Sequence, residues 1–174
     1  THDVREAIKM GDHIAIMKGG EFVQIGTPEE IVAKPVDDYV RDFSEDVPRH
    51  KVLTVNTIMS TDCSRCYESD TVTNALAIMN KHESQATYVV NANNNYRGTL
   101  TRKQATTASE SGASITDLLQ KDSVTSPGAL IETLITDATQ LNHPIPVVDT
   151  EHKLIGTVDH RAILKAIEGP ESKQ

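Results

Sequence analysis

The sequence is poor in positive charge and contains no long basic run. Its 174 residues include 17 Lys and Arg against 25 Asp and Glu, which gives a formal net charge of −8. Nucleic acids and anionic membrane surfaces are bound by clustered cations that neutralise phosphates. The charge balance therefore argues against nucleic acid as a partner.

Long apolar segments are also absent. No stretch of about 18 apolar residues occurs, so nothing in the sequence is expected to span a bilayer. The chain does not open with the basic start, apolar stretch and small-residue cleavage site of a signal peptide, so we expect a cytosolic protein. Its 37% of apolar residues is still enough for the core of one compact domain or of two small ones.

Cysteine occurs only twice, as the pair Cys63 and Cys66. A zinc site would need two further ligands, and no second Cys pair or His pair stands at zinc-finger spacing. The histidines are scattered singly, and none is paired at i, i+4 as a helical metal site requires. The Cys pair falls in a predicted polar loop between two helical stretches, unlike the helix-start dithiol of thioredoxin-like proteins. We expect two loop thiols and no metal; a metal- or redox-active module built on them is the alternative.

The most informative feature that the sequence does contain is an internal repeat. Two segments of the first half return in the second, namely ATYVVN (86–91) as PIPVVD (144–149) and YRGTL (96–100) as LIGTV (154–158). The offset is constant, since Gly98 corresponds to Gly156 and 156 minus 98 is 58. Two copies that each bury only part of an apolar face are expected to stack through their strands, with both glycines at turns or close approaches of the backbone.

Local patterns define the elements of each copy, which are interpreted as helix, strand, turn, strand and helix. Residues 87–90 and 145–148 are short runs rich in β-branched residues, each followed by turn residues. The helix predicted over residues 71–82 has one apolar face with the spacing of a core-facing helix, made of Val72, Ala75, Leu76 and Met79.

The chain before the repeat has a different pattern. The predicted order is a helix over 3–10, a strand over 13–17, a turn at Gly19-Gly20 and a strand over 22–25. A second helix begins after Thr27, the predicted N-cap, with Pro28 at the first helical position and Glu30 as the capping-box partner. Pro35 is expected to end this helix, and the polar stretch 44–51 is interpreted as a linker.

On these residues the repeat resembles a tandem pair of CBS domains, the βαββα modules named for cystathionine β-synthase. The pattern Val-Val-(Asn/Asp)…Gly-Thr-(Leu/Val), present twice, carries the resemblance. It implies an α+β fold in which two CBS repeats stack into a pseudo-two-fold disc. It also implies clefts that bind adenine nucleotides, and a homodimer in which two discs pair.

The first part resembles the last stretch of an ABC-transporter ATPase domain. The matching segments are THD (1–3), GDHIAIMKGG (11–20) and QIGTPEEI (24–31). The resemblance implies that His2 is the switch histidine, which contacts the γ-phosphate of ATP in the parent ATPase. No phosphate loop Gly-x-x-x-x-Gly-Lys-(Ser/Thr) occurs in the sequence, so we expect the chain alone not to be an enzyme.

An ATPase end joined to two CBS modules resembles the ATP-binding subunit of importers of glycine betaine, carnitine or choline. The resemblance implies a regulatory module that senses a nucleotide or ionic strength, works at the inner face of the cell membrane and has the transporter's membrane subunit as partner. A ligand-free dimerisation module is the alternative. The predicted domains are the ATPase end (1–46), a linker (47–51), CBS repeat 1 (52–109), CBS repeat 2 (110–168) and a tail (169–174).

The expected ligand sites depart from the family pattern. In nucleotide-binding CBS modules the glycine strand is followed by Thr/Ser-x-x-Asp, whose Asp holds the ribose hydroxyls, but Gln104 and Ala162 stand at that position here. The neighbouring cations are Arg102 and Lys103 in one copy and His160 and Arg161 in the other.

The guanidinium group of arginine suits phosphate oxygens, so we expect a ligand held through phosphates. The family resemblance implies cyclic di-AMP as this ligand, favoured over AMP or ATP. Solvated surface charges are the alternative. No cofactor is expected to be required. The candidate ligand-binding residues are Tyr88, Thr99, Arg102, Ile145, Thr157, His160 and Arg161.

Overall fold

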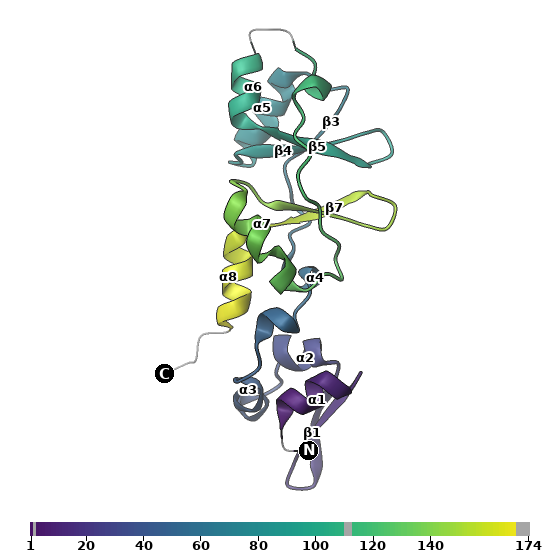
Figure 1. Cartoon of the computed structure of the whole chain (residues 1–174), viewed down its shortest axis with the longest axis vertical. Coiled ribbons are helices and arrows are strands. Elements are labelled where there is room, and N and C mark those ends of the chain that lie inside the picture. The colour runs from purple at the N-terminus through teal and green to yellow at the C-terminus, as the bar shows by residue number, and fades with distance from the viewer. Residues whose placement is uncertain (2, 110–112, 170–174) are drawn as a thin grey trace.

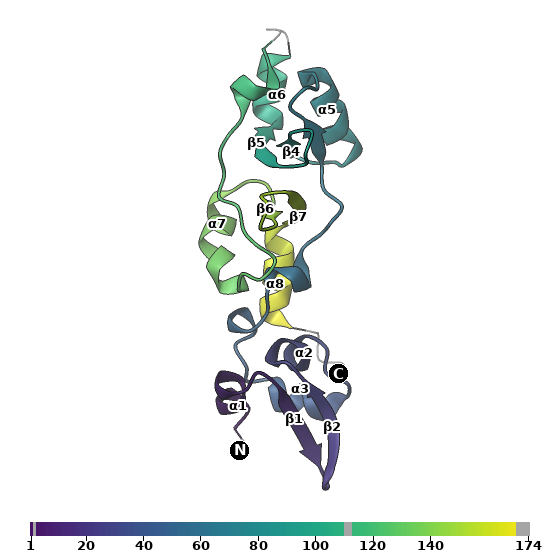
Figure 2. The ribbon, with the colours of Figure 1, turned by 90° about the vertical axis from the view of Figure 1, so that its right-hand side faces the viewer.

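The computed structural model of the chain describes residue 1 and residues 3–109 and 113–169. Three lobes follow one another along the longest axis (Figure 1): the N-terminal lobe at one end, the second repeat in the middle and the first repeat at the other end. The chain therefore runs past the second repeat to build the first and then returns, as Figure 2 shows from the side. His2, the predicted switch histidine, lies outside the described residues.

The N-terminal lobe follows the order that the sequence predicts. Its elements are α1 (Val4–Met10), β1 (Ile14–Lys18), β2 (Glu21–Gly26), α2 (Pro28–Ala33) and α3 (Asp38–Ser44). Gly19 and Gly20 have φ values of 63° and 90°, so they form the turn of the β1–β2 hairpin at no steric cost. The predicted capping box of α2 is confirmed, because the side chains of Thr27 and Glu30 each accept a bond from the other residue's backbone N–H.

The segment interpreted as a linker carries structure of its own. Residues Arg49–Lys51 form a 3₁₀ turn. Val47 is buried in an apolar cluster that also contains Val32 of α2 and Ile163 of the second repeat. The N-terminal lobe and the second repeat thus share a core, which the polar composition of this stretch did not reveal.

The first repeat is a three-stranded sheet with helices. Its elements are α4 (Val55–Ile58), β3 (Arg65–Tyr67), α5 (Val72–Lys81), β4 (Ala86–Val90), β5 (Tyr96–Thr101) and α6 (Arg102–Ala108). The short β3 is parallel to β4, and β4 is antiparallel to β5. The predicted apolar face of α5 is confirmed, since Val72, Ala75 and Met79 are buried and Leu76 packs against the same cluster.

The second repeat has the same hairpin and a weaker first strand. Its elements are η3 (Ile131–Leu134), α7 (Ile135–Gln140), β6 (Ile145–Val148), β7 (Leu154–Val158) and α8 (His160–Glu168), preceded by the turn η2 (Ile115–Leu118). The pairing Val147↔Gly156 repeats Val89↔Gly98, and both hairpins shift register immediately afterwards. Where the first repeat has β3, the second has a single parallel bridge between Thr125 and Val147.

The two repeats exchange the segments that lead into them, which confirms the stacked pair. Ser60, before the first repeat's sheet, pairs with Thr157 of the second repeat, and Gln120, before the second, pairs with Thr99 of the first. This exchange requires both glycines. A Cβ on Gly156 would lie 2.5 Å from the Ser60 carbonyl oxygen, and one on Gly98 would lie 2.8 Å from that of Gln120.

Candidate functional site

An open cleft of about 250 Å³ lies between the two repeats. One wall is the segment leading into the first repeat, from Ile58 to Ser64, and the opposite wall is the start of α8 with Asp159 and Ala162. Tyr88 of β4 and Thr157 of β7 lie between these walls. Residues from both repeats are therefore needed to form the cleft.

Hydrogen bonds hold the cleft residues in place. Ser60 and Thr157 exchange backbone bonds of 2.8 and 2.9 Å, which fixes one wall on the end of β7. The Tyr88 hydroxyl donates to the Pro144 carbonyl at 2.6 Å and so bridges the repeats. Asp159 is the N-cap of α8, where its carboxylate accepts from the Ala162 N–H at 2.7 Å. The carboxylate of Asp159 is thus used to cap the helix. Position 162, where the family pattern has the ribose-binding Asp, is occupied by Ala162.

Ser64 gives the cleft an unpaired polar group. The residue is 4% exposed, and its hydroxyl oxygen has no hydrogen-bond partner among the described residues. A buried hydroxyl without a partner costs about 1–3 kcal/mol, so such groups are rare unless something else satisfies them. Because Ser64 is a lining residue of the cleft, a ligand bound there is a candidate for that partner.

The charges at the cleft are acidic rather than basic. Asp62 and Asp159 line it, together with His82, whose Nδ1 lies 3.7 Å from Asp62 Oδ1. None of the described lining residues is Lys or Arg. The interior is therefore suited to hydroxyl and ring nitrogen groups of a ligand, and phosphates would have to lie outside it.

The structure brings together only some of the residues that the sequence selected. Tyr88 and Thr157 line the cleft. His160 and Arg161 are exposed in the first turn of α8, next to Asp159 and Ala162.

The other selected residues lie outside the open cleft. Ile145 is 2% exposed within the core cluster shared with the N-terminal lobe, and Thr99 is completely buried. The Arg102 guanidinium donates to the Ser84 carbonyl and to Asn80 Oδ1, so it braces the first repeat. Lys103 is exposed.

Sequence reasoning missed the wall formed by residues 58–64, including Ser60, Asp62 and Ser64. The repeat pattern could have indicated it only indirectly. Gly156 requires a close backbone neighbour, but the identity of that neighbour depends on the exchange of segments between repeats.

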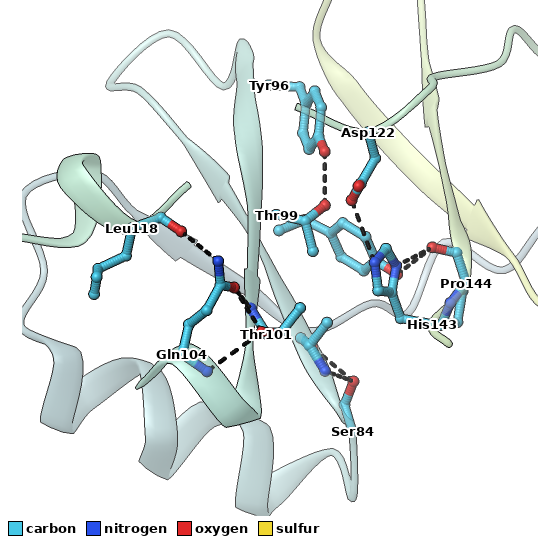
Figure 3. A network of polar contacts seen from close by, with 11 residues as sticks. Ser84, Tyr96, Thr99, Thr101, Gln104, Leu118, Asp122, His143 and Pro144 are labelled. Carbon is cyan, nitrogen blue, oxygen red and sulfur yellow. Dashed lines mark hydrogen bonds and ion pairs between the residues drawn. The ribbon is translucent and has the colours of Figure 1, made fainter. Parts of the chain in front are cut away.

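At the counterpart of the cleft, around Thr99 and Gln104, side chains of the chain itself form a polar network (Figure 3). His143 Nε2 lies 3.3 Å from Asp122 Oδ2, and its Nδ1 lies 3.2 Å from the Pro144 carbonyl oxygen. Tyr96 shares a 2.7 Å hydrogen bond with the Thr99 hydroxyl. Burial raises the pKa of Tyr96 to about 12.

Gln104 belongs to this network. It stands where the ribose-binding Asp is expected, and its side-chain amide donates to the Leu118 carbonyl while its oxygen accepts from Thr101. The amide is thus committed to the protein itself. Among the described residues, the two pseudo-symmetric sites therefore differ in their lining.

One cysteine of the pair lies in a loop as predicted, and the other does not. Cys63 precedes β3 and is half-buried, while Cys66 lies in β3 and is 1% exposed. The prediction was wrong for Cys66 because the parallel pairing of β3 with β4 is too short to be seen in the sequence. The two side chains contact different apolar clusters, and burial raises the pKa of Cys63 and that of Cys66, the latter to about 11. Both thiols are thus disfavoured as thiolates.

Two properties of the described residues bear on other kinds of site. Within them, no group of three or more His, Cys, Asp or Glu residues is placed to hold a metal ion. None of the helices there is long and apolar enough to cross a membrane.

Comparison with known families agrees with the exchanged, stacked repeats. The CBS domain family matches residues 45–111 and 115–169. The chain belongs to the CBS domain family. Its two CBS domains thus coincide with the two repeats described above.

Curated relatives match the N-terminal lobe as well as the CBS domains. The glycine betaine transport ATP-binding protein OpuAA of Bacillus subtilis is 37% identical over 97% of this chain and 40% of its own length. The glycine betaine/carnitine transport ATP-binding protein GbuA of Listeria monocytogenes is 35% identical over 98% of this chain and 43% of its own length. The chain therefore spans less than half the length of these relatives.

Solved structures share the fold of the pair. A CBS domain pair/ACT domain protein of Thermotoga maritima covers 67% of this chain with 97% of its own, at a TM-score of 0.61 and 20% identity. Staphylococcus aureus OpuCA covers 62% of this chain with 92% of its own, at a TM-score of 0.56 and 19% identity. At these identities the likeness establishes the fold alone.

Proposed function

We propose that this chain is the regulatory end of the ATP-binding subunit of an osmoprotectant importer. The support is the similarity to transporter ATP-binding proteins over nearly the whole chain, N-terminal lobe included. In this proposal residues 1–46 belong to the ATPase domain, the CBS pair is a sensor, and the parent protein works with a membrane subunit at the inner face of the membrane. The chain itself carries out no catalysis in this role.

The proposed signal is an adenosine compound bound in the open cleft. The observation that carries this proposal is the buried, unpartnered hydroxyl of Ser64 in a cleft built by both repeats. Two CBS structures of the same fold were solved with such compounds: protein MJ0100 with 5′-methylthioadenosine and S-adenosylmethionine, and CBSX2 with AMP. Tyr88 is an aromatic residue of the lining, 2% exposed, and Ser60, Ser64 and Thr157 are hydroxyl-bearing residues of the same lining.

Cyclic di-AMP is the proposed compound because of the cations just outside the cleft. His160 and Arg161 occupy the exposed first turn of α8, directly between Asp159 and Ala162, which line the cleft. A guanidinium there can form charge-assisted bonds with a phosphate while the adenosine part lies inside. Arg102 is excluded from this role by its bonds within the first repeat.

A second disc is the proposed partner of this one. Leu164 on α8 is 58% exposed and Ile135 on α7 is 40% exposed, and α7 packs against α8. Exposed apolar side chains on neighbouring helices are typical of an interface between chains. Light scattering of the wild type and of Leu164→Lys tests this, with a dimer expected for the first and a monomer for the second. A wild type that stays monomeric at high concentration would contradict the proposal.

Calorimetry with adenosine, AMP, ATP and cyclic di-AMP tests the ligand. We expect binding of cyclic di-AMP and a loss of about ten-fold in Ser64→Ala, the effect of one hydrogen bond. Ser69→Ala is the matched control, because Ser69 is exposed on the turn after β3 and does not line the cleft. No heat with any of the four compounds would refute the adenosine site, and binding of AMP alone would refute cyclic di-AMP.

A further inference from the structure

The first turn of helix α2, in the N-terminal lobe, is hydrogen-bonded to the CBS pair. The Glu29 carboxylate accepts bonds from the Thr54 N–H at 2.8 Å, from the Thr54 hydroxyl at 2.7 Å and from the Thr57 hydroxyl. Thr54 is the N-cap residue of α4, and its own side chain makes no capping bond. Glu29 therefore places a negative charge at the N-terminus of a helix that belongs to the CBS pair, where the helix dipole favours it.

The last turn of α2 is held to the CBS pair through Arg49. The guanidinium donates from Nη1 to the Val32 carbonyl at 2.7 Å and from Nε to the Ala166 carbonyl at 2.9 Å. Val32 is in the last turn of α2 and Ala166 in the last turn of α8. One cation thus satisfies carbonyls at the C-terminal ends of two helices, where they lack intrahelical partners and carry partial negative charge.

Both contacts, that of Glu29 and that of Arg49, involve elements that extend to the open cleft. Helix α4 ends at Ile58, where the first wall of the cleft begins. Helix α8 begins beside Asp159 in the opposite wall and runs about 14 Å to its end near Arg49, at 1.5 Å per residue over nine residues. Each wall of the cleft is therefore the near end of an element whose far end is attached to α2.

We propose that α2 transmits the state of the cleft to the N-terminal lobe, with Glu29 and Arg49 as the two positioning residues that attach it to the cleft walls. A ligand that changes the separation of the walls moves the far ends of α4 and α8, and α2 must follow both. By linkage, the same attachments let a movement of the N-terminal lobe change the affinity of the cleft. This inference rests on the proposed function only in that the cleft binds a ligand.

Hydrogen exchange of the chain with and without saturating AMP or cyclic di-AMP tests the transmission. In the wild type, ligand is expected to change the exchange of amides in α2 and β1 as well as around the cleft. Arg49→Lys keeps the positive charge but loses the pair of guanidinium donors that reaches both carbonyls. Glu29→Gln keeps the size of the side chain but loses its negative charge. Both are expected to bind ligand within about two-fold of wild type while the change in α2 and β1 is lost.

The ion pair between Arg97 and Glu68 supplies matched controls. It lies on the exposed surface of the first repeat at 3.2 Å, away from α2, so Arg97→Lys and Glu68→Gln are expected to keep the distant change. Transmission is overturned if the wild type binds ligand and α2 stays unchanged, or if Arg49→Lys and Glu29→Gln retain the change.

A ligand-free arm separates this inference from the proposed function. Without ligand, Glu29→Gln is expected to speed exchange of the Gly169 amide, which bonds to the Lys165 carbonyl at the end of α8. A local role of Glu29 would speed exchange only in α4. If no compound binds the wild type, the proposed function fails, but the ligand-free experiment still tests whether α2 connects Glu29 to the end of α8. An unchanged exchange rate of the Gly169 amide in Glu29→Gln would overturn that connection.

Discussion

His143 and Asp122 form a close contact inside the protein, with Nε2 and Oδ2 at 3.3 Å and side chains only 5% and 9% exposed. Asp122 Oδ2 is buried and has no aligned hydrogen bond among the described residues. The imidazole beside it is therefore the main polar group that offsets its loss of contact with water. The other ring nitrogen faces the Pro144 carbonyl, which also accepts from Tyr88. This pair lies in the polar network at the counterpart of the open cleft (Figure 3).

Asp122→Ala is expected to destabilise the fold strongly. Removing one partner of a buried pair leaves the other uncompensated, at a cost of about 3–5 kcal/mol. Asp62→Ala is the control, because Asp62 is 88% exposed where it meets His82 and such pairs contribute about 0–1 kcal/mol. Urea unfolding measures both, and equal losses would show that the His143 contact is not an energetically important pair.

The different linings of the two pseudo-symmetric sites predict one ligand site per chain and a difference between equivalent residues. Lys103 is the counterpart of Arg161, since 161 minus 103 is 58, but it stands beside Gln104, whose amide is bonded within the protein. Arg161→Ala is expected to weaken cyclic di-AMP binding about ten- to a hundred-fold, the effect of losing a charge-assisted contact. Lys103→Ala should leave the affinity unchanged. Calorimetry that shows two sites per chain, or equal effects of the two substitutions, would contradict the asymmetry.

Glu29 makes the attachment of the N-terminal lobe sensitive to acid. Burial alone would raise the pKa of this carboxyl, but the hydrogen bonds from Thr57 and Thr54 outweigh it and hold the pKa below its usual 4.5. The folded state therefore binds the proton less readily than the unfolded state. Its stabilising contribution is complete above pH 4.5 and is lost as the pH falls through the lowered pKa.

The difference in unfolding free energy between wild type and Glu29→Gln should accordingly shrink on acidification. Urea unfolding from pH 7 to pH 3 measures it, with the exposed Glu21→Gln as control. A difference that stays constant over this range would show that the charge of Glu29 does not contribute.

Elements of the repeats and of the N-terminal lobe could be predicted because their signals are local. The spacing of Val72, Ala75 and Met79 indicates a buried helix face, and the capping box of Thr27 and Glu30 marks a helix start within four residues. The lining of the cleft could not be predicted in the same way. Ser64 becomes important only through the exchange of segments between the repeats, a contact between distant parts of the chain.

Resemblance to the family selected equivalent residues in both copies, and the structure places them differently. Thr157, next to Gly156, lines the cleft together with the start of α8. Thr99 and Arg102 in the other copy lie outside it. Their environments differ because Gln104 and the contact of Asp122 with His143 belong to a polar network there, and this difference depends on packing that sequence symmetry hides.

Gly156→Ala tests the exchanged architecture itself. The added Cβ would lie 2.5 Å from the Ser60 carbonyl oxygen, a backbone atom that cannot move without separating the strand pair. Overpacking of this kind costs about 1–3 kcal/mol. Gly128→Ala is the matched control, because a Cβ there meets nothing within 4 Å, and replacing such a glycine is neutral or stabilises by up to about 1 kcal/mol. Thermal and urea unfolding should separate the two variants clearly.

Since Ser60 and Thr157 both line the cleft, the loss of stability in Gly156→Ala should be accompanied by weaker ligand binding, whereas Gly128→Ala should bind as the wild type does. If Gly156→Ala were as stable as Gly128→Ala, the segment before the first repeat could not lie against the glycine strand of the second.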